Sequence, residues 1–263
     1  MRKAILSIAA AFACINSHAQ EADDCGLWLN TNVEKQITKG LKADVGVGFR
    51  TRNNFQTADR WDASAGITYK LTKWLKTDAE YSFLYTNKTE KLTYKKESLD
   101  DGMPSYNNWR PSFWTPRHRF SVSLTGQAKC HNIEFSLRER WQYTYRPSAI
   151  TERYDFDNEI WEDTDVSGKG KNILRSRLQI EYSKKKALLK PYANVEIFNS
   201  MALEKVRMTA GTKIRLSKRN DIEVYYRYQA TNAKEENNEP NCHYFGAGYG
   251  SPEKVCGLSI QSC

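Results

Sequence analysis

Apolar and polar residues alternate along much of this chain. In LKADVGVGFRTR, residues 41–52, every odd position from Leu41 to Phe49 is apolar, while the even positions carry charges or glycine. Side chains of a β-strand point alternately to the two faces of a sheet, so this segment predicts a strand with one apolar and one charged face. The apolar face lies inward in a soluble β-sandwich or lipocalin and outward in a membrane-spanning barrel.

The same alternation recurs and predicts about eleven strands, many of them about 9–11 residues long, which is the length that a tilted strand needs to cross a bilayer. The expected strands are 27–37, 41–52, 60–71, 75–85, 117–125, 133–146, 174–183, 191–198, 206–216, 221–229 and 243–249. Short connections at 38–40, 72–73, 126–131, 184–189 and 218–220 alternate with longer ones at 53–59, 87–115, 147–171, 199–204 and 231–241. Short turns at one rim and long loops outside the cell are typical of an outer-membrane barrel.

Arginine and acidic residues dominate the polar faces of the expected strands. Arginine with glutamate suits enclosed, bidentate pairing better than a face in bulk water. We therefore expect these faces to line the barrel interior as an ion-pair network, with a structural role or in contact with a solute. Asp78 shares this face, and the predicted network residues are Arg50, Arg52, Glu80, Arg117, Arg119, Glu134, Arg138, Arg140, Arg175, Arg177, Glu181, Glu196, Arg207, Arg215, Glu223 and Arg227.

The apolar faces carry one charge inside a strand, Glu139. A carboxylate on lipid is costly, so we expect a β-bulge near residue 139 that returns it to the interior. Aromatic residues gather near strand ends and are expected to form girdles at the two membrane interfaces, the alternative being the core of a soluble β-protein. These aromatics are Trp28, Trp61, Trp74, Trp141, Tyr143, Tyr145, Tyr182 and Tyr228.

The N-terminus has the three parts of a secretory signal. A basic start at Arg2 and Lys3, an apolar stretch and a Ser17-His18-Ala19 end predict that residues 1–19 are removed before Gln20. Residues 20–263 are then one exported outer-membrane barrel domain with an atypical tail at 250–263. Bacterial barrels have even strand numbers, and whether VCGLSIQ in this tail adds a twelfth strand stays open.

Five of the six cysteines lie beyond the predicted cleavage site. Export permits disulfides, but an odd number leaves at least one thiol unpaired, and pairing cannot be read from sequence. Cys256 and Cys263 are the favoured pair by proximity, with unpaired thiols as the alternative. The cysteines concerned are Cys25, Cys130, Cys242, Cys256 and Cys263.

Several segments, among them GFRTR, RHRFSVSL, RERWQYTYRP and PYANVEIF, are similar to a family of Gram-negative outer-membrane β-barrels known only as a domain of unknown function. The similarity runs from about Leu27 to Tyr249. The resemblance implies an outer-membrane location, contact with lipid and lipopolysaccharide, and insertion by the barrel-assembly machinery. The resemblance implies no particular biochemical activity.

Other chemistries find little support in the sequence. The formal net charge of +9 is spread over the strands, so no nucleic-acid binding is expected. No Cys or His spacing predicts a metal site, and SGKGK and GAGYG lack the context of a nucleotide site, so no cofactor is expected. The acidic segment YDFDNEIWEDTD, residues 154–165, is expected to be a solvated loop, with a Ca²⁺ site as the alternative.

An enzyme is not expected. A rim-located hydrolase needs a serine beside a histidine, and only His118 with Ser112 or Ser121 offers one, with Ser121 on the opposite face. We predict an all-β, antiparallel up-and-down transmembrane barrel of about 10–12 strands with a mostly filled interior. The predicted role is structural or in surface interaction. A narrow pore for small anionic solutes is the first alternative, and the hydrolase is the second.

Overall fold

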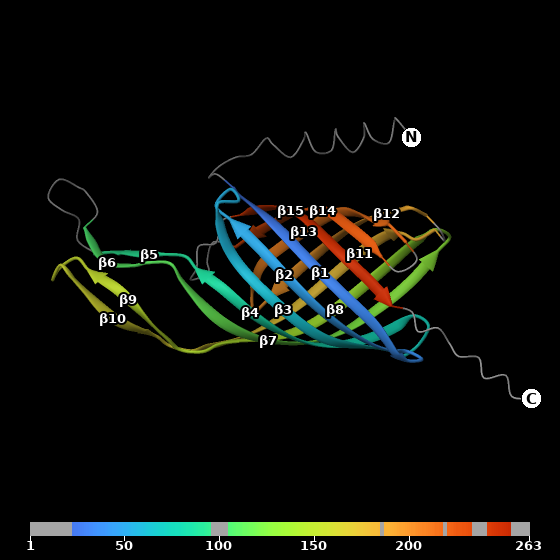
Figure 1. Ribbon diagram of the computed structural model, residues 1–263, viewed down its shortest axis with the longest axis horizontal. Coiled ribbons are helices and arrows are strands. Elements are labelled where there is room, and N and C mark those ends of the chain that lie inside the picture. The colour runs from blue at the N-terminus through green and yellow to red at the C-terminus, as the bar shows by residue number, and fades with distance from the viewer. Residues whose placement is uncertain (1–22, 96–104, 185–186, 218–219, 233–240, 254–263) are drawn as a thin grey trace, which may run out of the picture.

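A computed structural model of the protein describes residues 23–95, 105–184, 187–217, 220–232 and 241–253, in which eleven strands form a closed barrel (Figure 1). None of these residues belongs to a helix long and apolar enough to cross a membrane. The predicted signal peptide and the last ten residues lie outside the described part. The barrel strands are β1 (Asp24–Thr38), β2 (Leu41–Arg52), β3 (Thr57–Lys70), β4 (Leu75–Lys88), β7 (Phe113–Cys130), β8 (Ile133–Arg146), β11 (Lys169–Tyr182), β12 (Leu189–Asn199), β13 (Leu203–Arg215), β14 (Asp221–Thr231) and β15 (Cys242–Glu253).

The barrel closes between its first and last strands, which run parallel, with Asp24 opposite Cys242 and Lys35 opposite Glu253. All other barrel neighbours are antiparallel. An odd number of up-and-down strands sends the first and last in the same direction, so the closing pair has to be parallel. The long connections lie at one rim of the barrel, the long-loop rim, and the short ones lie at the other, the short-turn rim. Strand β1 therefore begins at the long-loop rim and ends at the short-turn rim.

The two longest connections fold into a second sheet that the sequence pattern did not predict. One contributes β5 (Lys91–Tyr94) and β6 (Tyr106–Arg110), and the other contributes β9 (Ala149–Asp155) and β10 (Ile160–Val166). The hairpins join where β6 pairs with β9, which gives the order β10-β9-β6-β5. This extension sheet projects beyond the long-loop rim (Figure 1).

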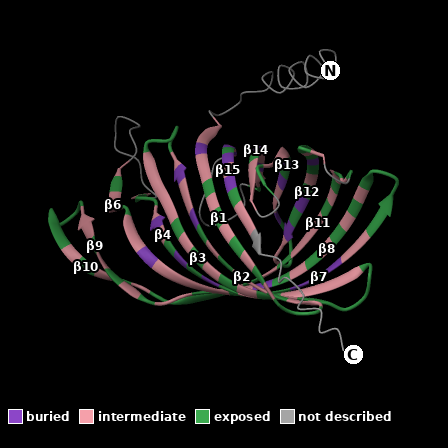
Figure 2. Cartoon of the chain, turned by 45° about the vertical axis from the view of Figure 1, so that its right-hand side comes forward, coloured by how far each residue is buried: buried purple, intermediate pink, exposed green. Residues whose placement is uncertain are grey.

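Exposure alternates from residue to residue along the barrel strands (Figure 2), and many of the exposed positions carry large apolar side chains. Val47 of β2 and Leu178 of β11 are each 60% exposed, whereas Glu196 of β12 is only 4% exposed. A soluble β-protein would bury its valines and leucines and expose its glutamates. The apolar face of LKADVGVGFRTR therefore points outward, as it does in a barrel surrounded by lipid.

Glu139 stays on this outer face, in the middle of β8. The prediction of a β-bulge near residue 139 is therefore wrong. Strand β8 pairs with β7 and with β11 in continuous register across residue 139. Ser176 lies directly opposite on β11, and its hydroxyl donates a hydrogen bond of 2.6 Å to the Glu139 carboxylate. This bond, rather than a change of register, offsets part of the cost of an outward carboxylate.

Replacing Glu139 with leucine is expected to raise the free energy of unfolding by about 1–2 kcal/mol, because it removes a charge from the lipid-facing surface. Ser176→Ala, which leaves the carboxylate without its donor, should lower it by about 1 kcal/mol. Urea unfolding of the protein in lipid vesicles measures both. A loss of stability in Glu139→Leu would show instead that the carboxylate makes a favourable contact on the outside of the barrel.

Candidate functional site

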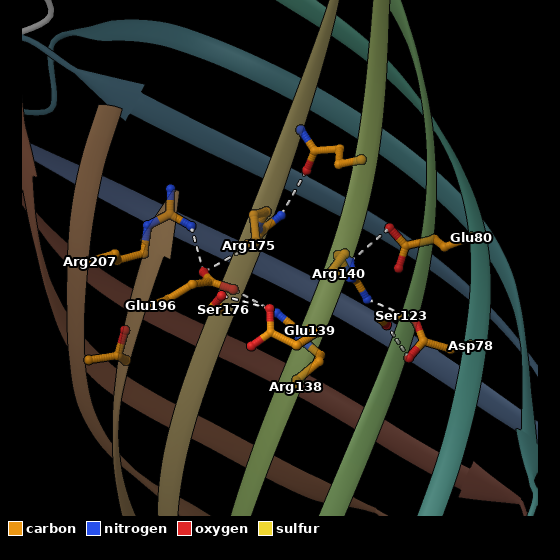
Figure 3. Close-up of polar contacts among 12 residues, drawn as sticks. Asp78, Glu80, Ser123, Arg138, Glu139, Arg140, Arg175, Ser176, Glu196 and Arg207 are labelled. Atoms are coloured by element: carbon orange, nitrogen blue, oxygen red, sulfur yellow. Dashed lines mark hydrogen bonds and ion pairs between the residues drawn. The ribbon is translucent and has the colours of Figure 1, made fainter. Parts of the chain in front are cut away.

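The barrel interior is organised around one buried carboxylate, Glu196 of β12 (Figure 3). Its Oε1 accepts from Arg138 of β8 at 2.7 Å, and its Oε2 accepts from Arg175 of β11 at 2.9 Å and Arg207 of β13 at 3.4 Å. The register places Glu196 opposite Arg207 and Arg177, and Arg177 opposite Arg138, while Arg175 reaches the carboxylate from two residues along β11. Three guanidinium groups thus share a single carboxylate, which leaves this cluster with surplus positive charge.

A second cluster forms around Arg140, two residues along β8 from Arg138. Its Nη2 bonds to Asp78 of β4 at 3.0 Å, and its Nη1 lies 3.7 Å from Glu80 (Figure 3). The Ser123 hydroxyl of β7, which lies between these strands, donates to the other oxygen of Asp78 at 2.5 Å. Here two carboxylates face one guanidinium, so this cluster balances part of the charge of the first.

Neutral amide side chains accept hydrogen bonds from guanidinium N–H groups that do not bond to the shared carboxylate. Arg175 donates through Nη1 to the side-chain oxygen of Gln142 at 2.9 Å, and Arg207 donates through Nη2 to that of Gln229 at 2.7 Å. Both glutamines are buried. Amide acceptors hold the guanidinium groups in place without cancelling their charge, so the interior is ordered and still cationic.

Trp28 of β1 provides a further partner for the arginines. The guanidinium carbon of Arg50 lies 2.9 Å from the centre of its ring, that of Arg227 lies 4.1 Å away and that of Arg207 lies 5.2 Å away. Such contacts are attractive because the ring face carries negative potential. Trp28 also meets Tyr244 edge to face, with ring centres 5.6 Å apart. Its assignment to a membrane girdle is therefore wrong: Trp28 lies inside the barrel.

The other residues of the predicted network also lie along the inner side of the barrel. Arg117, Arg177, Arg215 and Glu223 occupy β7, β11, β13 and β14. Contacts within the network include Arg52 with Asp59 at 3.4 Å, Arg119 with Thr144 at 3.3 Å, Arg227 with Thr209 at 3.0 Å, Glu134 with Gln127 at 3.3 Å and Glu181 with Lys213 at 2.8 Å.

The sequence pattern did not predict the inward position of some interior residues. Trp28, Gln142 and Gln229 follow the strand alternation but carry no charge, so a search for charged faces passed over them. Buried Glu204, which bonds to Lys171 at 2.6 Å, lies beside an irregularity in the pairing of β12 with β13. Simple alternation cannot foresee a side chain that such an irregularity turns inward.

The serine–histidine pairs considered for a hydrolase are not assembled. His118 of β7 lies on the outer side, where its Nδ1 is hydrogen-bonded to the Tyr81 hydroxyl at 2.8 Å. Ser121 is buried on the inner side of the same strand. No contact joins Ser112, in the link between β6 and β7, to His118 among the described interactions. A nucleophile and its base need to lie within hydrogen-bond reach, which neither serine offers here.

The acidic segment at 154–165 is largely ordered, as the β9–β10 hairpin. Among the described residues, no His, Cys, Asp and Glu side chains come together in a group that could hold a metal ion. Cys25, Cys130 and Cys242 are free thiols. Cys256 and Cys263, the favoured disulfide pair, lie outside the described residues.

A family model described as a protein of unknown function (DUF2490) matches residues 25–239. No curated protein matches the chain. Among solved structures, the beta domain of the Bordetella autotransporter BrkA is similar with a TM-score of 0.50 and 14% identity, over 82% of this chain and 86% of that one. The likeness to BrkA supports an outer-membrane β-barrel fold.

Two further structures are more distant. The translocator domain of the autotransporter NalP from Neisseria meningitidis has a TM-score of 0.44 and 8% identity, over 87% of this chain and 90% of that one. The porin NanC has a TM-score of 0.41 and 11% identity, over 84% of this chain and 94% of that one.

Proposed function

The chain belongs to the DUF2490 family of proteins of unknown function, and from its geometry we propose that it is an integral outer-membrane protein whose closed barrel anchors a surface-exposed sheet. Its role is structural or in surface interaction. Export through the signal at residues 1–19, insertion by the barrel-assembly machinery and contact with lipopolysaccharide belong to the same proposal.

The buried polar network inside the barrel is the observation that carries this proposal. Polar side chains from several strands are buried at the middle of the barrel, among them Glu196 and Gln142, with exposed fractions of 4% and 3%. A barrel of about ten to twelve strands is narrow enough for its own side chains to fill it. Buried side chains that are joined by hydrogen bonds and ion pairs stiffen the barrel and leave little room for solute, which suits an anchor better than a wide channel.

The extension sheet supplies a surface for interaction. A row of aromatic rings crosses it, with ring centres 5.1–5.6 Å apart from one ring to the next. Several of these rings are highly exposed, including Tyr94 at 55% and Trp161 at 51%. Exposed apolar groups on an ordered element are typical of contact surfaces. The row consists of Tyr94, Tyr106, Phe156, Tyr154, Trp161 and Trp109.

Surface detection of an inserted epitope tests this orientation. A tag in the turn at 156–159 of the β9–β10 hairpin is expected to bind antibody on intact cells. The matched control carries the same tag in the turn at 71–74 on the short-turn rim and should bind antibody only after the outer membrane is permeabilised. The reverse labelling, or equal labelling of both variants, would contradict a barrel that displays its extension sheet outside.

A narrow, anion-preferring pore is the second candidate function. The observation in its favour is the surplus of arginine around Glu196, because a ring of cationic side chains favours anions. Planar-bilayer recording separates the two roles. The anchor predicts no steady conductance from the folded protein, whereas a chloride-selective conductance would establish the pore.

A further inference from the structure

A pocket of about 440 Å³ lies where the extension sheet meets the long-loop rim of the barrel. This rim pocket is defined by its charged lining, namely Lys91, Arg110, Arg146, Arg153, Asp165 and Lys169. The basic residues come from both sheets, since β5, β6 and β9 belong to the extension and β8 and β11 belong to the barrel. Five cationic side chains thus surround a single lining carboxylate.

The strand register sets like charges directly against each other in this pocket. Lys91 lies opposite Arg110 in the β5–β6 pair, and Arg146 lies opposite Lys169 in the β8–β11 pair. Like charges at directly opposite positions destabilise a sheet. The two pairs also repel each other: burial, and then the neighbouring Arg146 guanidinium, lower the pKa of Arg110 below its ordinary value.

The three arginines of the pocket have different partners within the protein. Arg153 is paired with Glu162, whose Oε1 lies 3.0 Å from its Nε. Arg146 donates through Nη2 to the Ser167 carbonyl at 2.7 Å, and Arg110 packs over the ring of Phe113, 5.2 Å from its centre. The Nε atoms of Arg110 and Arg146 are buried without a hydrogen-bond acceptor. A buried guanidinium N–H without an acceptor is costly.

We propose that the rim pocket binds a phosphorylated ligand, and that Arg110 and Arg146 together bind its phosphate group. Guanidinium groups match phosphate oxygens with paired N–H donors, so two of them facing one cavity suit a phosphate or diphosphate group. The volume lies within the usual range for small-ligand sites. Thr93 and Asn108 line the same pocket and add neutral hydrogen-bonding groups for the remainder of the ligand. This site is separate from the barrel interior and does not depend on whether the interior conducts.

Titration calorimetry with inorganic pyrophosphate, on the full-length protein in an uncharged detergent, tests the proposal. The wild type is expected to bind, and Arg110→Gln with Arg146→Gln should weaken binding about tenfold or more, because both charged hydrogen-bonding partners are lost. The control variant, Lys39→Gln with Lys73→Gln, removes the same charge from the short-turn rim and should bind as the wild type does. Equal weakening in both variants would overturn the site, because it would show only a general charge effect.

Thermal stability gives a readout that a purely structural pair of arginines would not produce. Without ligand, Arg110→Gln should melt at a higher temperature than the wild type, since one of the repelling charges is gone. With pyrophosphate, the wild type should gain stability and the variant should not. A variant that melts lower without ligand, together with unchanged pyrophosphate affinity, would contradict the proposal.

Vesicles containing lipopolysaccharide, intact or dephosphorylated, distinguish a lipid-borne phosphate from a soluble one. Binding that needs both the lipid phosphates and the two arginines identifies the lipid as the source. Binding of pyrophosphate alone identifies a soluble ligand. If neither probe binds in an arginine-dependent way, the rim pocket is not a phosphate site.

Discussion

Replacing Glu196 with glutamine is expected to destabilise the barrel by about 3–5 kcal/mol, which is the range for breaking a buried ion pair by removing one partner. The substitution keeps the shape of the side chain and removes the carboxylate that Arg138, Arg175 and Arg207 share. Three guanidinium groups then face one another without the carboxylate that they share. Urea unfolding in lipid vesicles measures the loss.

Glu134→Gln is the matched control. Glu134 is also an inward carboxylate, but its contacts are with the neutral side chains of Gln127 and Ser183 at 3.3 and 3.5 Å. Its replacement should cost less than about 1 kcal/mol. Adding Arg207→Met to Glu196→Gln should restore part of the lost stability, because it removes one of the unpaired charges. Equal losses for Glu196→Gln and Glu134→Gln would contradict a network centred on Glu196.

Replacing Trp28 with alanine is expected to open the interior and to lower the free energy of unfolding by about 2–4 kcal/mol, through lost packing and lost cation–π contacts. The ring holds Arg50 and Arg227 against the barrel wall, with guanidinium carbons 2.9 and 4.1 Å from its centre. Without the ring these side chains gain freedom beside a new cavity. We expect a small conductance with preference for chloride in planar bilayers.

Trp61→Ala separates the opening of the interior from loss of an aromatic residue. Trp61 lies on the outer face, 54% exposed, and its ring centre is 4.3 Å from that of Phe49. This variant should lose some stability and remain without conductance. Equal conductance in both variants, or none in Trp28→Ala, would show that Trp28 does not close the interior.

Strand alternation predicted the barrel and its faces because a strand shows its periodicity locally. Segments such as LKADVGVGFRTR need no distant information to be recognised, and arginines on one parity mark the enclosed face. The match to the DUF2490 family confirms the resemblance drawn from these segments. The placement of Arg138, Arg175 and Glu196 on neighbouring strands follows from the same parity, although their individual pairings do not.

Features set by contacts between distant segments were beyond the sequence pattern. The extension sheet forms only because two hairpins separated by barrel strands β7 and β8 meet at Asn108 and Trp109. Glu139 stays outside because β8 keeps its register, and Ser176, on another strand, supplies a donor that offsets part of the cost. Trp28 follows the alternation of β1, but its arginine partners come from strands far away in the chain, so the sequence gives no sign that this tryptophan belongs to the interior rather than to a membrane girdle.

Gel mobility of the protein, extracted with detergent from outer-membrane fractions and run with and without boiling, tests the account most directly. A closed barrel integral to the outer membrane should give a compact, fast band that shifts on boiling, and Glu196→Gln should shift at a lower temperature than the wild type. Recovery of the protein in the soluble periplasmic fraction, with no heat-dependent shift, would contradict the lipid-facing barrel and return its valines and leucines to the core of a soluble protein.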